Sequence, residues 1–432
     1  MTLTKPFLIT MIIAMFSQAI QAQTEKKPFH VYLSGDGGKY LKFGLNAQIW
    51  GRQTQLNPNS SVGSNSTKGT YDIVIRRLRA EVLGKLTDRV FFHFQVGQNN
   101  INFSQNTGPY NSPLSIMDLL GEYQFNKWLH LGVGMNGWGA GTTRYSAQSS
   151  SKQLTLDAPI YQQNNISSTF GNRNLSIYAK GNFGKFNYRV AVTNPYKQST
   201  NHLNTYSATV STRTPQPQFL GMLTYQFLGK ESIAEPYNRA TYLGEKKILN
   251  LGIGYMVQSK AMWRLDHPGL DTLYHQMGVF GADLYYDSPL GKKGAALTLY
   301  TAYNYCDYGK NYLRMIATPN PASTGSGSGF YGIGTGSILY AQAGYLIAKS
   351  KNEKNVARTQ LYGSSQLAFL EALQTPMWMF EAGVNYYLTG TFGPKITLGY
   401  QNRPVFELFE GETKHMQTTR KSMVVLQFQV SF

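Results

Sequence analysis

Positively charged residues recur at alternate positions of otherwise apolar segments, a spacing that could build a surface attractive to anions. In segment 71–86, Arg77, Arg79 and Glu81 share one face of an extended chain, and apolar residues occupy the other face. The same alternation places four further bases on the polar faces of their segments: Lys42, Lys180, Arg189 and Lys395. Fixed positive charges raise the local concentration of anions. The pattern therefore favours electrostatic recognition of an anion.

The whole chain carries an excess of positive charge. It has 40 Lys and Arg residues against 22 Asp and Glu residues, a formal net charge of +18. An alternative interpretation is that the bases only balance acids on the same faces, such as Asp118, Glu122 and Glu381. Because bases outnumber acids nearly two to one, the sequence favours the anion-binding interpretation. The interpretation that the bases only balance acids stays open.

Metal binding and catalysis have little support in the sequence. Asp266, His267, Asp271 and His275 crowd one polar stretch, but no nucleophile stands at a recognisable spacing from them. The chain has one cysteine, Cys306, and seven histidines, which excludes a Cys-rich zinc site and an iron–sulfur cluster. We expect no cofactor, no metal and no enzymatic activity.

The first 22 residues have the pattern of a secretory signal peptide. Lys5 precedes an apolar run from Phe7 to Phe16, and small residues end at Ala22. This run is too short to span a bilayer as a helix, which needs about 20 residues. No later segment is apolar for 18 residues. The alternatives are a secreted soluble protein and a barrel that spans the outer membrane of a Gram-negative bacterium.

Alternation of apolar and polar residues recurs along the mature chain, as in strands with one apolar face. At the end, Val424, Leu426, Phe428 and Val430 alternate with polar positions up to the final Phe432. Sixteen such segments occur. The connections between them alternate between short and long, which is typical of bacterial outer-membrane β-barrels. Two places could change the count by two: the long connection 228–246 and the weak segment 356–363.

These patterns predict an all-β protein, a transmembrane antiparallel β-barrel of about 16 strands. Residues 1–22 form the signal peptide, 23–39 a periplasmic N-terminal segment and 40–432 the barrel, with short periplasmic turns and long extracellular loops. The composition of polar loops such as 57–69 and 319–329 predicts that they are exposed to solvent. Three tryptophans near strand ends predict an interfacial aromatic girdle: Trp50, Trp128 and Trp378.

Arg76 and Arg77 are adjacent, although neighbours on a regular strand face opposite sides. With Arg77 in the lumen, Arg76 would meet lipid, where an arginine at the midplane costs about 2–4 kcal/mol. A β-bulge would turn both side chains inward. Alternatively, Arg76 faces a neighbouring protomer or lies near the rim and reaches the interface.

Four segments together resemble the phosphate-selective porin O and P family of outer-membrane porins. They are IRRLRAEVLGKLTDRVFFHFQVGQ (75–98), GVGMNGWGAGTTRYSAQSSSKQLTLDAP (132–159), YAKGNFGKFNYRVAVTN (178–194) and EAGVNYYLTGTFGPKITLGYQN (381–402). The resemblance implies a homotrimer of 16-stranded barrels whose third extracellular loop folds inward as a basic constriction. By position, it assigns the double arginine to Arg76 and Arg77 and the loop bases to Arg144 and Lys152.

The expected function is a passive outer-membrane pore for small hydrophilic solutes, with a preference for phosphate-like anions. Its partners would be outer-membrane lipid and small anionic solutes, without nucleic acid. An alternative is a structural or interaction barrel in a secretion or surface-assembly system. A third, weaker alternative is an outer-membrane hydrolase.

Overall fold

The computed structural model of the chain describes residues 30–34, 38–101, 114–137, 141–157, 173–194, 203–211, 216–234, 236–267, 271–317, 319–349 and 356–432. The predicted signal peptide lies outside these ranges and stays a prediction. Of the predicted N-terminal segment 23–39, only residues 30–34 and 38–39 are described. Among the described residues, no helix is long and apolar enough to cross a membrane.

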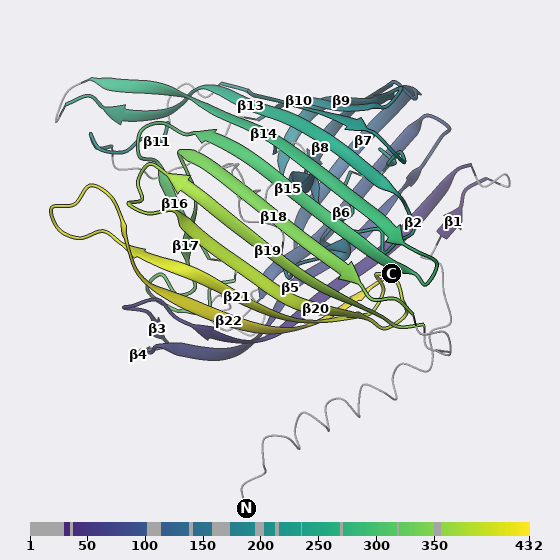
Figure 1. The fold of residues 1–432 in the computed structure, drawn as a ribbon. Helices are drawn as coiled ribbons and strands as arrows, with labels where there is room; N and C mark the ends of the chain where they lie inside the picture. The colour runs from purple at the N-terminus through teal and green to yellow at the C-terminus, as the bar shows by residue number, and fades with distance from the viewer. Residues whose placement is uncertain are drawn as a thin grey trace, which may run out of the picture.

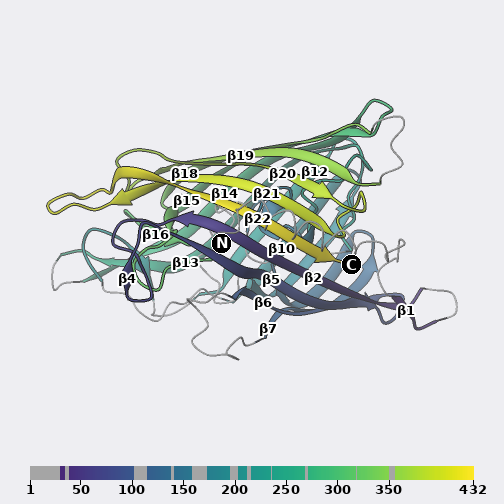
Figure 2. The same ribbon diagram turned by 90° about the horizontal axis from the view of Figure 1, so that it is seen from below.

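Sixteen antiparallel strands close into a barrel, as predicted (Figures 1 and 2). The last strand pairs with the first, for example Ala47 with Val430. The barrel strands are β2 (Tyr40–Gln55), β5 (Gly69–Lys85), β6 (Val90–Ile101), β7 (Ser115–Asn126), β8 (Leu129–Asn136), β9 (Asn174–Phe183), β10 (Phe186–Thr193), β12 (Gln218–Gln226), β13 (Ile248–Leu265), β14 (Thr272–Leu290), β15 (Ala295–Asp307), β18 (Gly336–Leu346), β19 (Arg358–Leu370), β20 (Met377–Tyr387), β21 (Lys395–Glu407) and β22 (Met416–Ser431).

The alternation of side chains explains why these segments form a barrel with an apolar exterior. In β22, Val424 and Leu426 are exposed on the outside, whereas Val425, Gln427 and Gln429 are buried on the inside. Most large exposed apolar side chains of the other strands lie on the same outer surface. Since every strand pairs on both sides, no edge is left to expose backbone polar groups to lipid.

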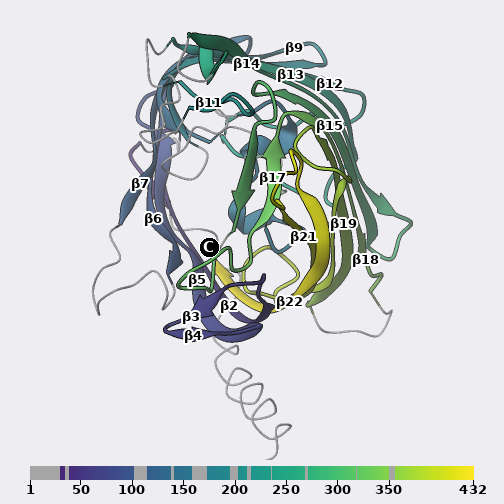
Figure 3. The same ribbon diagram turned by 90° about the vertical axis from the view of Figure 1, so that its left-hand side faces the viewer.

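The remaining elements are short. β1 (His30–Tyr32) pairs with the start of β2, and β11 (Thr209–Val210) pairs with β13. Two small hairpins are formed by β3 (Ser61–Val62) with β4 (Asn65–Ser66), and by β16 (Leu313–Ile316) with β17 (Phe330–Gly334). The β16–β17 hairpin belongs to the long connection 308–335 and lies within the ring of strands in the view along the barrel (Figure 3). The only described helices are two 3₁₀ turns, η3 (Arg144–Ala147) and η4 (Ser150–Lys152).

Two of the three tryptophans predicted for an aromatic girdle are exposed, as such a girdle requires, and one is not. Trp128 and Trp378 are half exposed on the outer surface, but Trp50 is 1% exposed and donates a hydrogen bond from Nε1 to Gln427 Oε1 at 2.7 Å. The placement of Trp50 in the girdle was therefore wrong. β2 continues to Gln55, so Trp50 lies within the strand, and its even position shares the inward face with Gln48.

The prediction that loops 57–69 and 319–329 are solvated was also wrong in part, because the two loops pack against each other. Asn57 N donates to Gly327 O at 2.8 Å, and the Asn57 side chain donates to Gly329 O at 2.7 Å. The Asn57 and Ser60 side chains are buried. Backbone hydrogen bonds hold this contact, and composition does not reveal them.

The C-terminal Phe432 completes the seam of the barrel: Phe432 N donates to Leu45 O at 3.1 Å, and Leu45 N donates to Phe432 O at 3.2 Å. Deleting Phe432 is expected to lower the yield of folded barrel, because unpaired backbone groups are costly in hydrocarbon. The yield can be measured as the fraction of heat-modifiable protein on SDS gels. Phe432→Tyr, which keeps both backbone bonds, is the control. An unchanged yield for the deletion would contradict the prediction.

Candidate functional site: an arginine cluster beside two inserted segments

An extracellular connection enters the barrel and crosses its lumen. Its described residues 141–157, the constriction loop, bond to the wall through backbone carbonyls, backbone N–H groups and side chains. Gln48 Nε2 donates to Ser150 O at 2.9 Å, and Gln429 Nε2 donates to Ser151 O at 2.8 Å. The predicted inward folding of this connection is therefore present in the structure.

Glycines on the inner wall make room for the constriction loop. A Cβ atom at Gly254 would lie 2.2 Å from Thr142 O, and one at Gly399 would lie 2.5 Å from Leu156 Cδ1. Glycine within a strand often marks the close approach of another segment. Inward glycines are thus a signal in the sequence that could have located the surface on which the loop packs.

A second segment enters from the opposite end of the barrel. Residues 228–247, the periplasmic insert, connect β12 to β13 on the side of the short turns. The two inserted segments meet: Ser149 N donates to Asn238 O at 2.9 Å, and Ala240 N donates to Lys152 O at 3.1 Å. The sequence identified 228–246 as too long for a turn. Its described residues, 228–234 and 236–246, contain no added strand, and their entry into the lumen was not predicted.

Arg144 and Glu231 join the constriction loop to the periplasmic insert. The Arg144 guanidinium forms hydrogen bonds with both Glu231 carboxylate oxygens and stacks over the Tyr285 ring at 3.8 Å. Glu231 also accepts hydrogen bonds from Tyr242 Oη and Asn250 Nδ2, both at 2.5 Å. Burial would raise the pKa of Glu231, but the charge of Arg144 and the hydrogen bonds from Arg144 and Tyr242 hold this pKa below its usual value. The pair is thus an ionised contact within the lumen.

The double arginine sits at a β-bulge, the first of the two arrangements that the sequence allowed. Along β2, Gln48 pairs with Arg77 and Ile49 pairs with Ile75, which leaves Arg76 as the extra residue. Both guanidiniums converge on Asp157 of the constriction loop. Arg76 Nε donates to Asp157 Oδ2 at 2.8 Å, and Arg77 donates to Asp157 Oδ1.

Other polar groups complete this site. Arg76 also donates to Asn100 Oδ1 at 2.8 Å and lies over the Trp50 ring at 5.5 Å, whereas Arg77 donates to Gln48 Oε1 at 2.7 Å. Two planar guanidinium forks around one carboxylate match the geometry that oxyanions prefer. The site therefore holds an oxyanion, here supplied by the chain itself.

Arg79 and Arg173 extend the pair into a cluster of four arginines. Arg79 interacts electrostatically with the other three, and its hydrogen bonds go to neutral oxygens of Leu78, Gln98 and Asn99. Arg173 donates to Asp118 at 3.2 Å. Asp157 and Asp118 are the carboxylates that contact the cluster among the described residues. Among the described residues, the four arginines of the cluster therefore contact two carboxylates.

Three predicted lining residues instead anchor the inserted segments. Lys180 Nζ donates to Ile233 O at 2.7 Å and lies 2.7 Å from Glu122. Arg189 donates to Pro236 O at 3.2 Å, and Lys395 Nζ donates to Gln153 O at 3.0 Å. All three bases are buried. In this arrangement they do not face open solvent, and the pairing of Lys180 with Glu122 matches the balancing interpretation.

Lys42 and Lys152 are half-buried, Lys42 near the start of β2 and Lys152 on η4. The role of all these bases as an anion lining stays a prediction.

Three arginines of the lumen were not predicted: Arg52 and Arg403, which are buried, and Arg173, which is partly buried. Arg52 is paired with Asp72 and donates to Pro319 O at 2.6 Å, and Arg403 donates to Gln55 O at 2.6 Å. Arg52 and Arg403 share the inward parity of their strands, so alternation could have identified them. Arg173 precedes a strand, where no parity applies.

The loop residues considered for a metal or a hydrolase do not form a single cluster. His267 lies 3.4 Å from Asp266, while His275 pairs with Asp307 at 2.7 Å on strands β14 and β15. Across the described ranges, no group of three or more His, Cys, Asp or Glu side chains is placed to hold a metal ion.

Comparison with known proteins identifies the fold. No family model and no curated protein matches the sequence. Among solved structures, Salmonella typhi OmpF in complex with daunomycin matches with a TM-score of 0.53 and 8% identity, over 94% of this chain and 100% of that chain. An anion-selective porin from Comamonas acidovorans matches with a TM-score of 0.51 and 12% identity, over 91% of this chain and 100% of that chain.

At these identities the likeness concerns the fold alone. The chain has the general fold of bacterial outer-membrane porins, a closed 16-stranded barrel with an apolar exterior. Such a barrel belongs in the outer membrane of a Gram-negative bacterium, the location that the sequence predicted.

Proposed function

We propose that the protein is a porin for passive diffusion of small hydrophilic solutes, with a preference for phosphate-like anions. The observation that carries this proposal is the gathering of Arg76, Arg77, Arg79 and Arg173 in the lumen, where Arg76 and Arg77 converge on one carboxylate, that of Asp157. In a narrow, low-dielectric lumen such a group of positive charges raises the local anion concentration. Guanidinium forks also match tetrahedral or planar oxyanions better than ammonium groups do.

Reversal potentials across a KCl gradient test the proposal. In planar bilayers near 0.1 M salt, the purified protein is expected to prefer chloride to potassium, and phosphate is expected to reduce the chloride current. The preference should weaken at 1 M salt, because the Debye length falls from about 10 Å to about 3 Å. A cation-selective reversal potential at 0.1 M would contradict the anion preference.

The filled lumen also suits a second candidate, a structural or interaction barrel of a secretion or surface-assembly system. The constriction loop, the periplasmic insert and the β16–β17 hairpin all occupy the interior. Open-channel conductance separates the two candidates, since a structural barrel conducts no steady current. We further infer a homotrimer, supported by the family resemblance and by exposed apolar side chains such as Tyr71 and Ile73 on β5, each 76% exposed.

A further inference from the structure

We infer that the periplasmic rim of the barrel binds the anionic headgroups of phospholipids in the inner leaflet of the outer membrane. The periplasmic rim is the set of connections on the side of the short turns: 86–89, 127–128, 184–185, 227–247, 291–294, 347–357 and 388–394. This inference goes beyond the proposed pore, and it does not depend on whether the barrel conducts.

Exposed charges are distributed unequally between the two ends of the barrel. Among the described residues, the periplasmic rim carries two exposed acids, Asp88 and Glu245, and nine exposed bases. These bases are Arg89, Lys127, Lys185, Lys230, Lys246, Lys247, Lys292, Lys293 and Lys349. The described connections at the extracellular end carry five exposed acids and three exposed bases, Lys68, Lys310 and Lys414. Exposed positive charge therefore gathers at the end that faces the inner leaflet.

Near strands β6 to β12, bases of the periplasmic rim lie beside aromatic side chains of the outer surface. Lys127 Nζ lies 5.8 Å from the centroid of the Trp128 ring, and Lys185 Nζ lies 5.9 Å from that of Tyr225. Trp128 is 52% exposed. Aromatic side chains on the outside of a barrel mark the level of the lipid headgroups. These two lysines therefore lie at headgroup level and on the outside of the barrel.

A second group of bases comes together at the turns that flank β15 and β18, although their charges repel one another. Lys349 N donates to Lys293 O at 2.9 Å, which brings Lys349 close to Lys292 and Lys293. Arg358 joins the same two turns, because its guanidinium donates to Gly294 O and, at 3.3 Å, to Ile347 O. Within the described ranges, neither connection contains an acid. An anion from outside the chain would relieve this repulsion.

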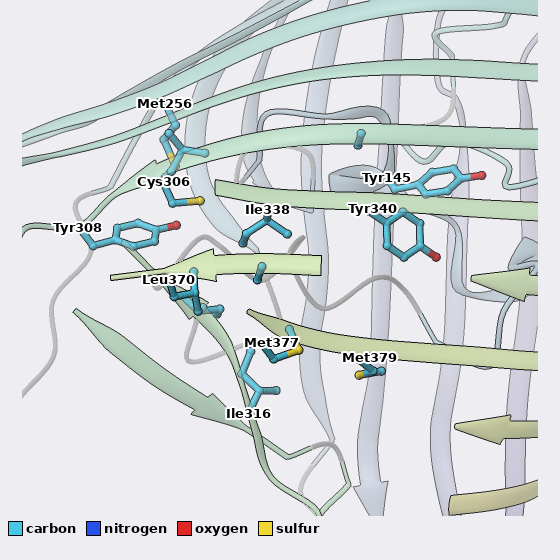
Figure 4. Close-up of a cluster of buried hydrophobic side chains, with 14 of the residues drawn as sticks. Tyr145, Met256, Cys306, Tyr308, Ile316, Ile338, Tyr340, Leu370, Met377 and Met379 are labelled. Carbon is cyan, nitrogen blue, oxygen red and sulfur yellow. The ribbon is translucent and has the colours of Figure 1, made fainter. Parts of the chain in front are cut away.

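The interior behind this second group is packed, so its lysines do not stand at the mouth of an open lumen. At the periplasmic end, Leu243 of the periplasmic insert packs with Ala296 and Leu346 of the wall. Farther along β18, Tyr340 belongs to the larger apolar cluster that Figure 4 shows. The anionic partner of these lysines is therefore expected at the membrane surface and not inside the barrel.

A phospholipid fits this surface better than a soluble anion does, because apolar side chains accompany the bases. Leu290, Tyr345 and Ile347, at the periplasmic ends of β14 and β18, are 39%, 44% and 41% exposed. They can contact acyl chains while the neighbouring lysines contact the phosphate. Anionic headgroups attract Lys and Arg side chains near the membrane surface, and each base adds to this attraction. The combination points to an anionic phospholipid such as phosphatidylglycerol.

Quenching of tryptophan fluorescence by brominated lipids tests the inference, because Trp128 and Trp378 are half exposed at opposite ends of the outer surface. The full protein is placed in phosphatidylcholine nanodiscs that contain about 20 mol% phosphatidylglycerol, and an equal amount of either lipid carries bromine on its acyl chains. In Trp378→Phe, which keeps Trp128, brominated phosphatidylglycerol is expected to quench about twice as strongly as brominated phosphatidylcholine. In Trp128→Phe, which keeps Trp378, the two lipids should quench equally.

Charge variants in the Trp378→Phe protein identify the bases responsible. Lys127→Gln combined with Lys185→Gln should bring the ratio of the two quenching values close to one. Lys310→Gln combined with Lys414→Gln makes the same charge change at the extracellular end and should leave the ratio unchanged. Heat-modifiable migration verifies that each variant is folded.

Equal quenching of Trp128 by the two lipids would overturn the inference. Equal quenching together with lysine-dependent retention on immobilised polyglutamate would assign the periplasmic rim to an acidic polymer instead. A ratio that stays near two in the folded Lys127→Gln and Lys185→Gln double variant would also contradict the role of these bases.

Discussion

Replacing Asp157 by Asn is expected both to destabilise the barrel and to strengthen its anion preference. Asp157 is the carboxylate that Arg76 and Arg77 share, so the substitution leaves two buried guanidiniums without a counter-charge. Removing one partner of a buried pair typically costs about 3–5 kcal/mol. At the same time, the arginine cluster gains one unit of positive charge. We expect a lower midpoint of thermal unfolding and a reversal potential shifted further toward the chloride potential.

Asp266→Asn is the matched control, because it makes the same charge change on an exposed extracellular loop. Asp266→Asn should change neither the midpoint of thermal unfolding nor the reversal potential by a measurable amount. Unchanged unfolding of Asp157→Asn would show that the contact with the double arginine contributes little. A shift toward potassium would contradict the anion-attracting role of the arginine cluster.

The pH dependence of stability gives an independent measurement of the same contact. Burial raises the pKa of Asp157, but the charges of Arg76 and Arg77 outweigh this effect and hold the pKa below the usual 3.8. A lowered pKa in the folded state stabilises the protein fully above the unfolded value, and this stabilisation is lost as pH falls through the folded value. Wild type should therefore lose stability below about pH 4, and Asp157→Asn should lose less over the same range.

The second large effect is expected for the pair that joins the constriction loop to the periplasmic insert. Glu231→Gln should lower thermal stability by about 3 kcal/mol, because Arg144 would stay buried without its carboxylate. Single-channel conductance should rise, since the periplasmic insert would lose its ion pair with the constriction loop and keep only hydrogen bonds such as that from Ala240 N to Lys152 O. Arg144→Gln should have the same two effects. The double variant should lose little more stability than either single variant, because the two residues act through one contact.

Glu245→Gln provides a control within the same insert. Glu245 pairs with Arg239 at 3.5 Å, and both side chains are substantially exposed. Glu245→Gln should therefore lower the free energy of unfolding by at most about 1 kcal/mol. Additive effects of Glu231→Gln and Arg144→Gln would contradict the coupling. Unchanged conductance in Glu231→Gln would indicate that the insert stays in place without this pair.

The positions of the strands could be predicted from the sequence, because a barrel with lipid outside and polar groups inside requires strict alternation of apolar and polar residues. The segment near 356–363, although weak in pattern, overlaps strand β19, which runs on to Leu370, and the described residues of the connection 228–246 contain no further strand. The bulge at Arg76 was predictable for a related reason, since an arginine in a regular outward position would have faced lipid. Alternation also defines the inward parity of Arg52 and Arg403, although these residues were not selected.

The positions of the inserted segments were harder to predict from the sequence, because a polar loop inside the lumen has the same composition as a polar loop in solvent. What distinguishes them is the surface that receives them: inward glycines such as Gly254, and wall bases such as Lys395 that donate to loop carbonyls. A sequence shows these bases as free charges. Only the arrangement in space shows that Lys180 and Lys395 donate hydrogen bonds to the inserted segments.

The hydrogen bonds between the constriction loop and the seam bear on how the barrel is assembled. Gln48 and Gln429, 381 positions apart in the chain, bond to each other at 2.8 Å and to adjacent carbonyls of the loop, Ser150 O and Ser151 O. Pairing of such distant strands is slow, because a large loop must close first. A slip of one residue would turn a glutamine from the lumen to lipid and break its bonds to the loop. The loop thereby favours one alignment of the first and last strands, and so acts as an internal template for closure.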